Sequence, residues 1–156
     1  MIATSIEQSK ELLRLGLPAE SSDMHYVRKI TDFMGNKIEN PMWSVPKYGN
    51  PNSKHANYIV QNFTDFEILA AWSIDALFDI IRNELDSYTI SNETDGYILF
   101  VDYATTDKQW RVWVAKCKFG RIVKIKHICT NENKLTATFE MIKWLLEQIL
   151  IKNELD

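Results

Sequence analysis

A run of basic residues is the part of this sequence whose chemistry is most readily interpreted. Between Lys108 and Asn131 the chain has seven Lys or Arg residues and no Asp or Glu. The chain has 18 basic and 21 acidic residues in total, so the remainder carries 11 basic residues against all 21 acidic ones. A surface of one charge sign attracts partners of the opposite sign, such as phosphates or carboxylates. The segment therefore predicts a basic surface with an acidic partner.

Two candidate strands make up this segment, over residues 109–119 and 121–129, and the single Gly120 between them predicts a tight hairpin. Alternate side chains of a strand share a face, and the lysine-bearing face should point outward because a buried unpaired ammonium is very costly. The expected outward face comprises Trp110, Val112, Val114, Lys116, Lys118, Ile122, Lys124, Lys126 and Ile128. The expected inward face comprises Trp113, Ala115, Cys117, Phe119, Val123, Ile125, His127 and Cys129.

The outward face fits two kinds of partner. Nucleic-acid-binding proteins combine cations for phosphates with flat rings for bases, and Trp110 lies beside the lysines. However, no aromatic RNA-binding motif, zinc finger or glycine-rich phosphate loop accompanies them. Acidic protein is the other partner, and Trp43, in an irregular segment, joins Trp110 as an expected exposed tryptophan of the kind that favours protein binding. Candidate binding residues are Trp110, Lys116, Lys118, Lys124, Lys126 and Trp43.

Self-association is a further possibility for the basic face. Acidic residues gather around a predicted helix and could meet the lysines of a second copy by charge complementarity. The acidic residues could equally meet the lysines of the same chain. These acidic residues are Asp65, Glu67, Asp75, Asp79, Glu84 and Asp86.

Thiols and imidazoles are the other candidates for chemistry. Their spacing matches no familiar zinc pattern, and His127 with Cys129 on one strand face is typical of a packed histidine and a small hydrophobic residue. Both thiols fall on the expected core face, which argues against an accessible nucleophile. No carboxylate pair is marked out by an apolar setting. We therefore predict no cofactor, no metal and no catalytic residue. An enzyme is the third function class, after protein binding and nucleic-acid binding. The ligand types considered are His25, His55, Cys117, His127 and Cys129.

Three helices and several strands are expected to position these residues. A helix over 4–15 has Thr4 or Ser5 as a cap, with Glu7 at capping-box spacing from Thr4, and ends at Gly16. The other helices are predicted over 73–85, capped by Ser73, and over 132–150. Strands are predicted over 24–30, 57–62 and 97–103, the last as a central strand because it is apolar at both parities. Residues 18–62 hold all four prolines and include a polar loop over 46–55.

Length and composition limit the class of protein. With 156 residues, 46% of them hydrophobic, the chain is expected to form a single α+β domain. We expect an antiparallel sheet of at least three strands with helices packed on one face, and a loop-rich insertion at about 18–62. No secretory signal and no apolar membrane span is recognisable, which predicts a cytoplasmic protein with two reduced cysteines and no membrane partner.

Three segments also occur together as a pattern. They are EQSKELLRLGLPAESSDM from Glu7, AAWSIDALFDII from Ala70 and TFEMIKWLLEQ from Thr138. The combination resembles a group of small proteins encoded in Bacteroidetes genomes, often within prophages or other mobile elements. The chain departs from it at Ala70-Ala71, where the group has Pro-Ala, at Thr138, where cysteine is common, and in the polar run 46–54.

The resemblance implies context more than mechanism, because its motifs contain no catalytic group. What it implies is an intracellular accessory protein of phage or mobile-element origin. Together with the basic segment, it leads to the hypothesis of a protein that binds another protein, with nucleic-acid binding through hairpin 108–128 as the alternative.

Overall fold

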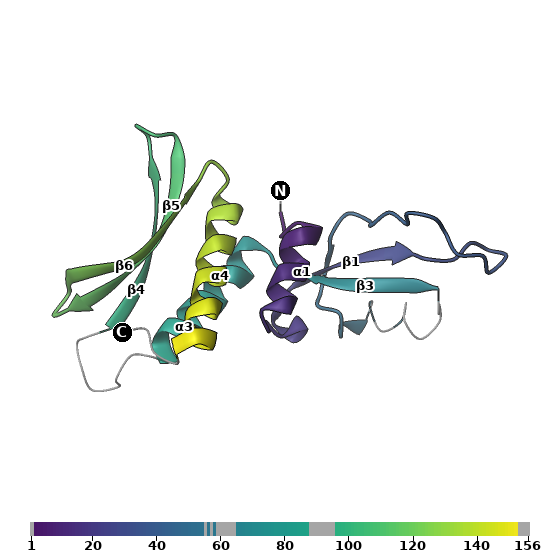
Figure 1. The fold of residues 1–156 in the computed structure, drawn as a ribbon, viewed down its shortest axis with the longest axis horizontal. Helices are drawn as coiled ribbons and strands as arrows, with labels where there is room; N and C mark the ends of the chain where they lie inside the picture. The colour runs from purple at the N-terminus through teal and green to yellow at the C-terminus, as the bar shows by residue number, and fades with distance from the viewer. Residues whose placement is uncertain (1, 55, 57, 59–64, 88–95, 153–156) are drawn as a thin grey trace. The chain divides into compact units, whose positions relative to one another are not determined.

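The chain folds as an α+β protein with two antiparallel three-stranded sheets. The computed structural model describes residues 2–54, 56, 58, 65–87 and 96–152, and it divides into two compact units, Met1–Ala76 and Leu77–Asp156 (Figure 1). The predicted α+β class with an antiparallel sheet is thereby confirmed. That the chain acts as one domain stays a prediction.

The first unit is a small sheet covered by a helix. Its strands β1 (Met24–Lys29), β2 (Lys47–Tyr48) and β3 (Phe66–Ala71) lie in the order β2-β1-β3, and helix α1 (Ile6–Arg14) packs against β3. A short 3-10 turn, Ala19–Ser21, precedes β1. The core of this sheet contains Ala3, Met24, Tyr26, Leu69 and Ala71, with Ile6, Leu13 and Trp43 packed against it.

Helix α1 begins one residue later than the expected capping box. The Ser5 hydroxyl accepts the backbone N–H of Gln8, and the Gln8 side chain accepts the N–H of Ser5. Thr4 is buried instead, where its hydroxyl bonds Ser9 and accepts the backbone N–H of Trp72. The helix ends as predicted, because Gly16 adopts a φ of 91° that a residue with a Cβ rarely adopts.

The irregular segment contains more structure than its prolines suggested. Strand β1 matches the predicted strand over 24–30, and β2 lies inside the predicted loop 46–55. Most of the predicted strand 57–62 falls outside the described residues. The long partner of β1 is β3, which the sequence did not mark as a strand.

The second unit contains the basic hairpin. After helix α3 (Ile74–Ser87), which begins at the boundary, it continues with β4 (Gly96–Ala104), β5 (Gln109–Lys118), β6 (Arg121–Asn131) and α4 (Lys134–Lys152). The strand order is β4-β5-β6. The prediction of β4 as the central strand is wrong, because β5 holds that place and the sheet as described has β4 at its edge. Both sets of alternating residues in β4 are apolar for different reasons. One set lies on the face that the helices cover, and the other lies on an apolar face that is open.

The predicted hairpin is confirmed at its turn. Lys118 pairs with Arg121, and the two residues between them, Phe119 and Gly120, have φ angles of 49° and 73°. Two positive φ values in a two-residue loop define the type I′ geometry that matches the twist of a hairpin.

Helices α3 and α4 cover one face of this sheet, as predicted (Figure 1). His127 of β6 stacks on Trp144 of α4 with ring centroids 4.4 Å apart, and the Lys134 ammonium lies 4.9 Å from the centroid of the Trp110 ring. The same ammonium lies 5.3 Å from the ring centroid of Phe78 on α3. Within the described residues, no helix is long and apolar enough to cross a membrane.

Candidate functional site

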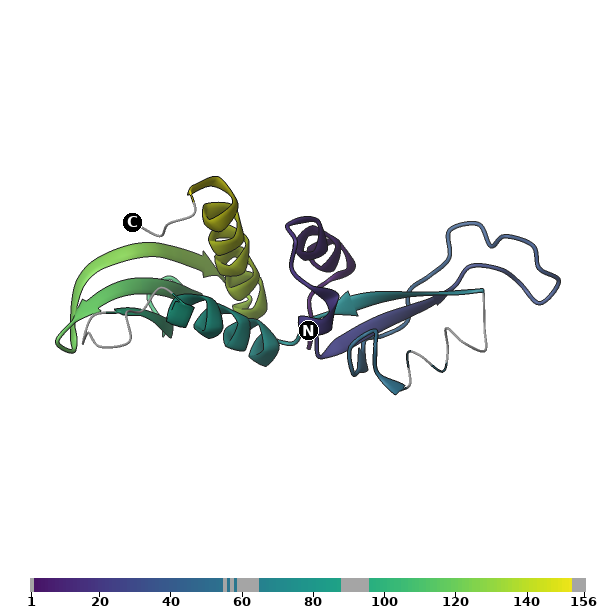
Figure 2. The same ribbon diagram turned by 90° about the horizontal axis from the view of Figure 1, so that it is seen from below.

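The faces of β5 differ from the predicted assignment in its first half. Val112 and Val114 are fully buried on the face that α4 covers, whereas Trp113 lies half-buried on the opposite face, stacked on Phe100. The prediction of Trp113 as inward and of the two valines as outward is therefore wrong. Its premise was that a face with lysines is outward along its whole length. In fact α4 covers this face at one end only, and the hairpin tip lies beyond it (Figure 2), at the end of β5 that holds Lys116 and Lys118.

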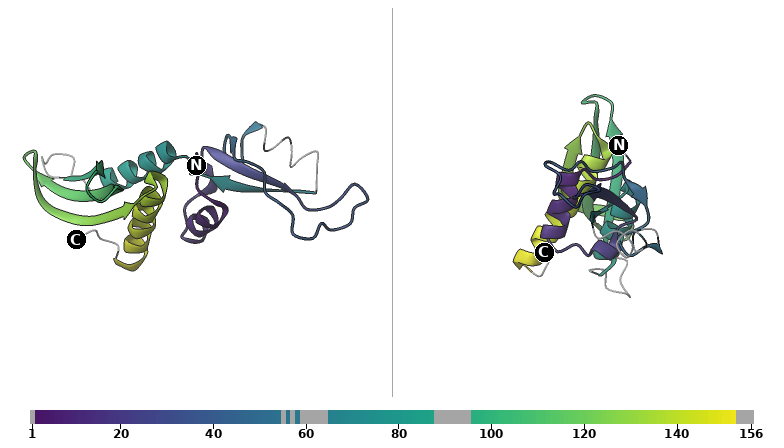
Figure 3. Two further views of the ribbon diagram at one scale, coloured as in Figure 1. Left: turned by 90° about the horizontal axis from the view of Figure 1, so that it is seen from above. Right: turned by 90° about the vertical axis from the view of Figure 1, so that its right-hand side faces the viewer.

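The lysines do gather at the hairpin end of the sheet, as predicted. Lys116 lies directly opposite Lys124, and Lys118 opposite Arg121, so the four cations share one face. Register shifts between Val114 and Ala115 and between Lys116 and Cys117 interrupt the β5–β6 pairing. Both strands bend along their length here (Figure 3). We call Lys116, Lys118, Arg121, Lys124 and Lys126 the basic cluster.

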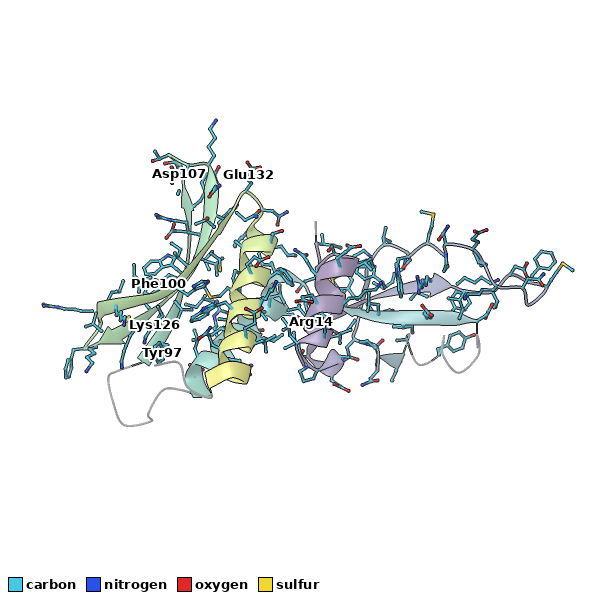
Figure 4. All side chains as sticks on the ribbon, viewed as in Figure 1. Arg14, Tyr97, Phe100, Asp107, Lys126 and Glu132 are labelled. Carbon is cyan, nitrogen blue, oxygen red and sulfur yellow. The ribbon has the colours of Figure 1, made fainter. Side chains whose placement is uncertain are left out.

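Tyr97 of β4 lies in the middle of the basic cluster. The ammonium groups of Lys116 and Lys126 are 5.9 and 5.7 Å from its ring centroid (Figure 4). Cations at such distances are attracted to the negative face of an aromatic ring. Tyr97 was not among the predicted binding residues, although its place at the start of the strand before a basic hairpin was a usable signal.

The hairpin tip carries an apolar side chain beside these cations. Phe119 is 81% exposed and occupies the left-handed backbone region, which a bulky residue adopts at an energetic cost. The predicted place of Phe119 on the inward face is wrong, because a type I′ turn projects its central residues into solvent.

Trp110 and Trp43 are both half-buried, where the sequence predicted exposure. Trp110 lies under Lys134 and is tilted against Tyr103. Trp43 belongs to the first unit, where the Arg28 guanidinium covers its ring at 4.4 Å.

Arg28 also connects Trp43 to a second surface feature. It forms an ion pair with Glu67, and both residues border a hollow of about 750 Å³. The remaining lining residues are Lys37, Ile38, Glu39, Asn40 and Pro41. The hollow thus has both charge signs, and no cluster of cations comparable to the one at the hairpin.

The buried thiols and imidazoles have structural surroundings. Burial raises the pKa of Cys129 to about 11, with a further contribution from Glu140, so its nucleophilic thiolate is scarce. Burial lowers the pKa of His127, which keeps the imidazole neutral against Trp144. His25 is fully buried, and its Nδ1–H donates to the carbonyl of Gly49 at 2.6 Å. Among the described residues, no group of three or more His, Cys, Asp and Glu side chains could hold a metal ion.

Several acidic residues considered for self-association form ion pairs within the chain. Glu67 pairs with Arg28 across β1 and β3, Asp65 just before β3 pairs with Lys29, and Asp79 pairs with Arg82 on α3. These pairs reduce the negative charge that the acidic residues could offer to the basic cluster.

A loop tip in the first unit exposes two large apolar side chains that were not among the predicted sites. Phe33 and Met34 are 92% and 73% exposed, and the Asp32 carboxylate fixes the turn by accepting the backbone N–H groups of Met34 and Asn36. These hydrogen bonds hold the pKa of Asp32 below its usual range, and the one from the backbone of Asn36 contributes most. An aspartate three residues before Gly35 was the signal for this turn.

Comparison with known proteins adds no relative. No protein-family model, no curated protein and no solved structure matches this chain. The site is therefore interpreted from its own geometry.

Proposed function

We propose that this chain is a small accessory protein that acts by binding an acidic surface of another protein, without catalysis or a cofactor. The observation that supports the proposal is the like-charge pair Lys116 and Lys124, which lie directly opposite each other across the hairpin. Like charges directly opposite each other destabilise a sheet. A partner with acidic groups would offset this loss of stability by neutralising the pair.

Phe119 supports the same function. It combines a strained backbone with a side chain that packs against little of its own protein, at the tip between Lys118 and Arg121. Strained residues concentrate at binding sites, and aromatic side chains are common anchors of protein interfaces. The expected partner surface is an apolar recess with carboxylates at its rim.

Nucleic acid is the second candidate, because phosphates would also satisfy the basic cluster. Binding of single strands relies on aromatic rings on which bases stack. Here Lys116 and Lys126 lie at the Tyr97 ring, and Lys134 lies at the Trp110 ring. A base would have to displace these ammonium groups, so the geometry favours protein over nucleic acid.

The cellular setting belongs to the same proposal. A cytoplasmic accessory role, with an origin in a phage or mobile element, rests on the resemblance of the three sequence segments described above. The basic cluster lies outside those segments.

A charge-reversed hairpin that keeps its fold provides the test. Arg121→Glu with Lys124→Glu places carboxylates opposite Lys118 and Lys116, so two repulsive cross-strand pairs become attractive ones. Lys10→Glu with Lys47→Glu is the matched control, because both lysines are exposed and lie in the first unit, and the net charge changes equally. Circular dichroism and thermal melting check that both variants fold.

Binding is measured with two defined probes and with cell lysate. Fluorescence anisotropy compares poly-L-glutamate with a single-stranded oligonucleotide of equal charge over a salt series, since electrostatic contacts with nucleic acid weaken steeply with salt. Affinity capture from nuclease-treated lysate of the source cells then compares wild type with both variants. We expect a protein that wild type and control retain and the charge-reversed hairpin loses. Equal capture by all three would refute the proposal, and recovery of nuclease-sensitive material alone would favour the second candidate.

A further inference from the structure

The face of the β4-β5-β6 sheet turned away from α4 is apolar toward the hairpin, and its polar residues lie toward the opposite end. Its members follow from the strand register, because directly paired residues share a face. We call this set the open face: Gly96, Ile98, Phe100, Asp102, Ala104, Gln109, Arg111, Trp113, Ala115, Cys117, Ile122, Ile125, Ile128 and Thr130.

The large side chains of the open face are exposed in the second unit. Four isoleucines are between 46% and 54% exposed, namely Ile98, Ile122, Ile125 and Ile128. Ile98 lies on β4 and the other three on β6. On the central strand β5 between them, Ala115 and Cys117 are small and buried. Soluble monomers rarely expose a contiguous apolar patch of this kind without a partner for it.

Three side chains of the open face hydrogen-bond to one another. Asp102 accepts the Nε–H of Arg111 and, at 2.9 Å, the indole N–H of Trp113. The hydrogen bond from Arg111, followed by that from Trp113, lowers the pKa of Asp102, so the carboxylate remains ionised. These three groups can therefore be covered without losing their hydrogen-bond partners, a loss that would cost stability.

The charge on the open face identifies what covers it. Asp102 and Arg111 are its only charged residues, and their charges cancel. A neutral face offers no attraction to an acidic partner of the kind proposed above, whereas two neutral copies meet without repulsion. The basic cluster, which points to the other side of the sheet, could not pair with itself in this way.

We propose that the open face is a homodimer interface, formed by sheet-on-sheet packing of two copies of this chain about a two-fold axis. Two sheets packed face to face lie about 10 Å apart and interdigitate their inner side chains, which gives the isoleucine rows partners. A two-fold axis brings the same residues together from both copies, and Asp102 of each copy can then meet Arg111 of the other.

The size of the face sets the expected affinity. Three strands about 4.8 Å apart and about nine residues long give a flat area near 30 Å by 14 Å. This area of about 420 Å² per copy is roughly half that of a standard interface, so we expect a weak, reversible dimer that dissociates at about 10 to 100 µM.

Sedimentation velocity of the full chain, from about 1 to about 300 µM, tests the proposal across the range in which such interfaces dissociate. Wild type should shift from monomer to dimer, and the dimer should persist in about 0.5 M NaCl, where charges are screened beyond about 4 Å. A monomer at the highest concentration would overturn the proposal. A dimer that salt dissociates would also overturn it, because charge pairing through the basic cluster would then hold the copies together.

Variants locate the interface. Ile98→Glu and Ile128→Glu each bury a carboxylate in the dimer and should weaken association at least about tenfold. Val45→Glu is the matched control, since Val45 is 70% exposed in the first unit and should leave association unchanged. A dimer that tolerates both open-face variants would overturn the proposal. If a variant does not fold, the concentration series on wild type still decides.

Discussion

Asp23 and Ser73 are joined by two hydrogen bonds across 50 residues of sequence. The Asp23 carboxylate accepts the backbone N–H of Ser73 at 2.8 Å and also its hydroxyl. The Ser73 hydroxyl in turn accepts the N–H of Ala76, and so caps α3. One carboxylate thus fixes both the start of β1 and the start of a helix.

Loss of this link should destabilise the first unit. Asp23→Ala leaves the Ser73 N–H and the cap without their acceptor, which should lower the free energy of unfolding by about 1–3 kcal/mol. A double-mutant cycle with Ser73→Ala in urea measures the coupling between the two residues. Asp75→Ala, at an exposed position of the same helix turn, is the control. Additive effects of the two substitutions would contradict the link.

This link also connects two of the three sequence segments described above. The Ser-Ser-Asp run lies at the end of the first segment, just before Met24, and Trp-Ser lies in the second. Trp72 is fully buried and donates its indole N–H to Ser21, while Asp23 binds Ser73. The two segments therefore contact each other, which sequence spacing alone could not reveal because the contact joins residues 50 apart.

The sequence predicted where helices and turns lie better than it predicted which face of a strand is buried. Caps, glycine stops and the hairpin depend on nearby residues, and so α1, α3, α4 and the turn at Gly120 could be located. The face of β5 depends on where α4 lies, which local alternation does not encode. The basic cluster could be predicted because like charges require solvent, whereas the open face could not, since its isoleucines are typical of a core.

The revised face assignment makes opposite predictions for two apolar residues of the sheet. Val114→Ala removes buried methyl groups under α4 and should cost about 1.5–3 kcal/mol of unfolding free energy. Ile128→Ala changes a side chain that is 46% exposed and should cost less than half as much in the monomer. Urea unfolding at low protein concentration compares them. A larger loss for Ile128→Ala would reverse the assignment of the two faces.

The lowered pKa of His127 should make the stability of the folded protein depend on pH. Burial against Trp144 lowers its pKa in the folded state, so the unfolded chain binds the proton more readily. The stability that its neutral form contributes is fully present above the unfolded value of about 6.5, and it is lost as pH falls from there through the folded value. Thermal melting from about pH 7.5 to about pH 5 should show this loss in wild type.

The variant His127→Phe isolates that effect, because a phenyl ring keeps the stack on Trp144 and cannot titrate. Its melting temperature should fall less than that of wild type over the same pH interval. Parallel curves for the two proteins would show that His127 does not contribute to the pH dependence.

Cys129 should be nearly inert in the folded protein. A pKa of about 11 instead of 9.0 lowers the thiolate fraction about a hundredfold at neutral pH, and burial limits access further. Cys117→Ser leaves Cys129 as the remaining thiol, and its reaction with an aromatic disulfide reagent can be followed at pH 8. We expect reaction on the timescale of unfolding in buffer, and rapid reaction in guanidinium chloride. Rapid labelling of the native variant would contradict the burial of this thiol.

Phe119→Asn should separate stability from binding. Asparagine tolerates the left-handed conformation that Phe119 adopts, and Asn-Gly is the preferred type I′ pair, so the variant should gain about 1 kcal/mol. For a chain of this length, that gain raises the melting temperature by about 2–4 °C. Phe119→Val, which is β-branched and disfavoured at positive φ, should instead lower it.

The same Asn substitution removes the apolar anchor of the hairpin tip. If the strain at Phe119 is maintained for a partner, the stabilised variant should bind that partner more weakly than wild type, although it folds better. Calorimetric melting and partner capture, performed on one preparation, give both readouts. A variant with higher stability and undiminished binding would show that the partner does not contact Phe119, and would leave the basic cluster as the determinant of recognition.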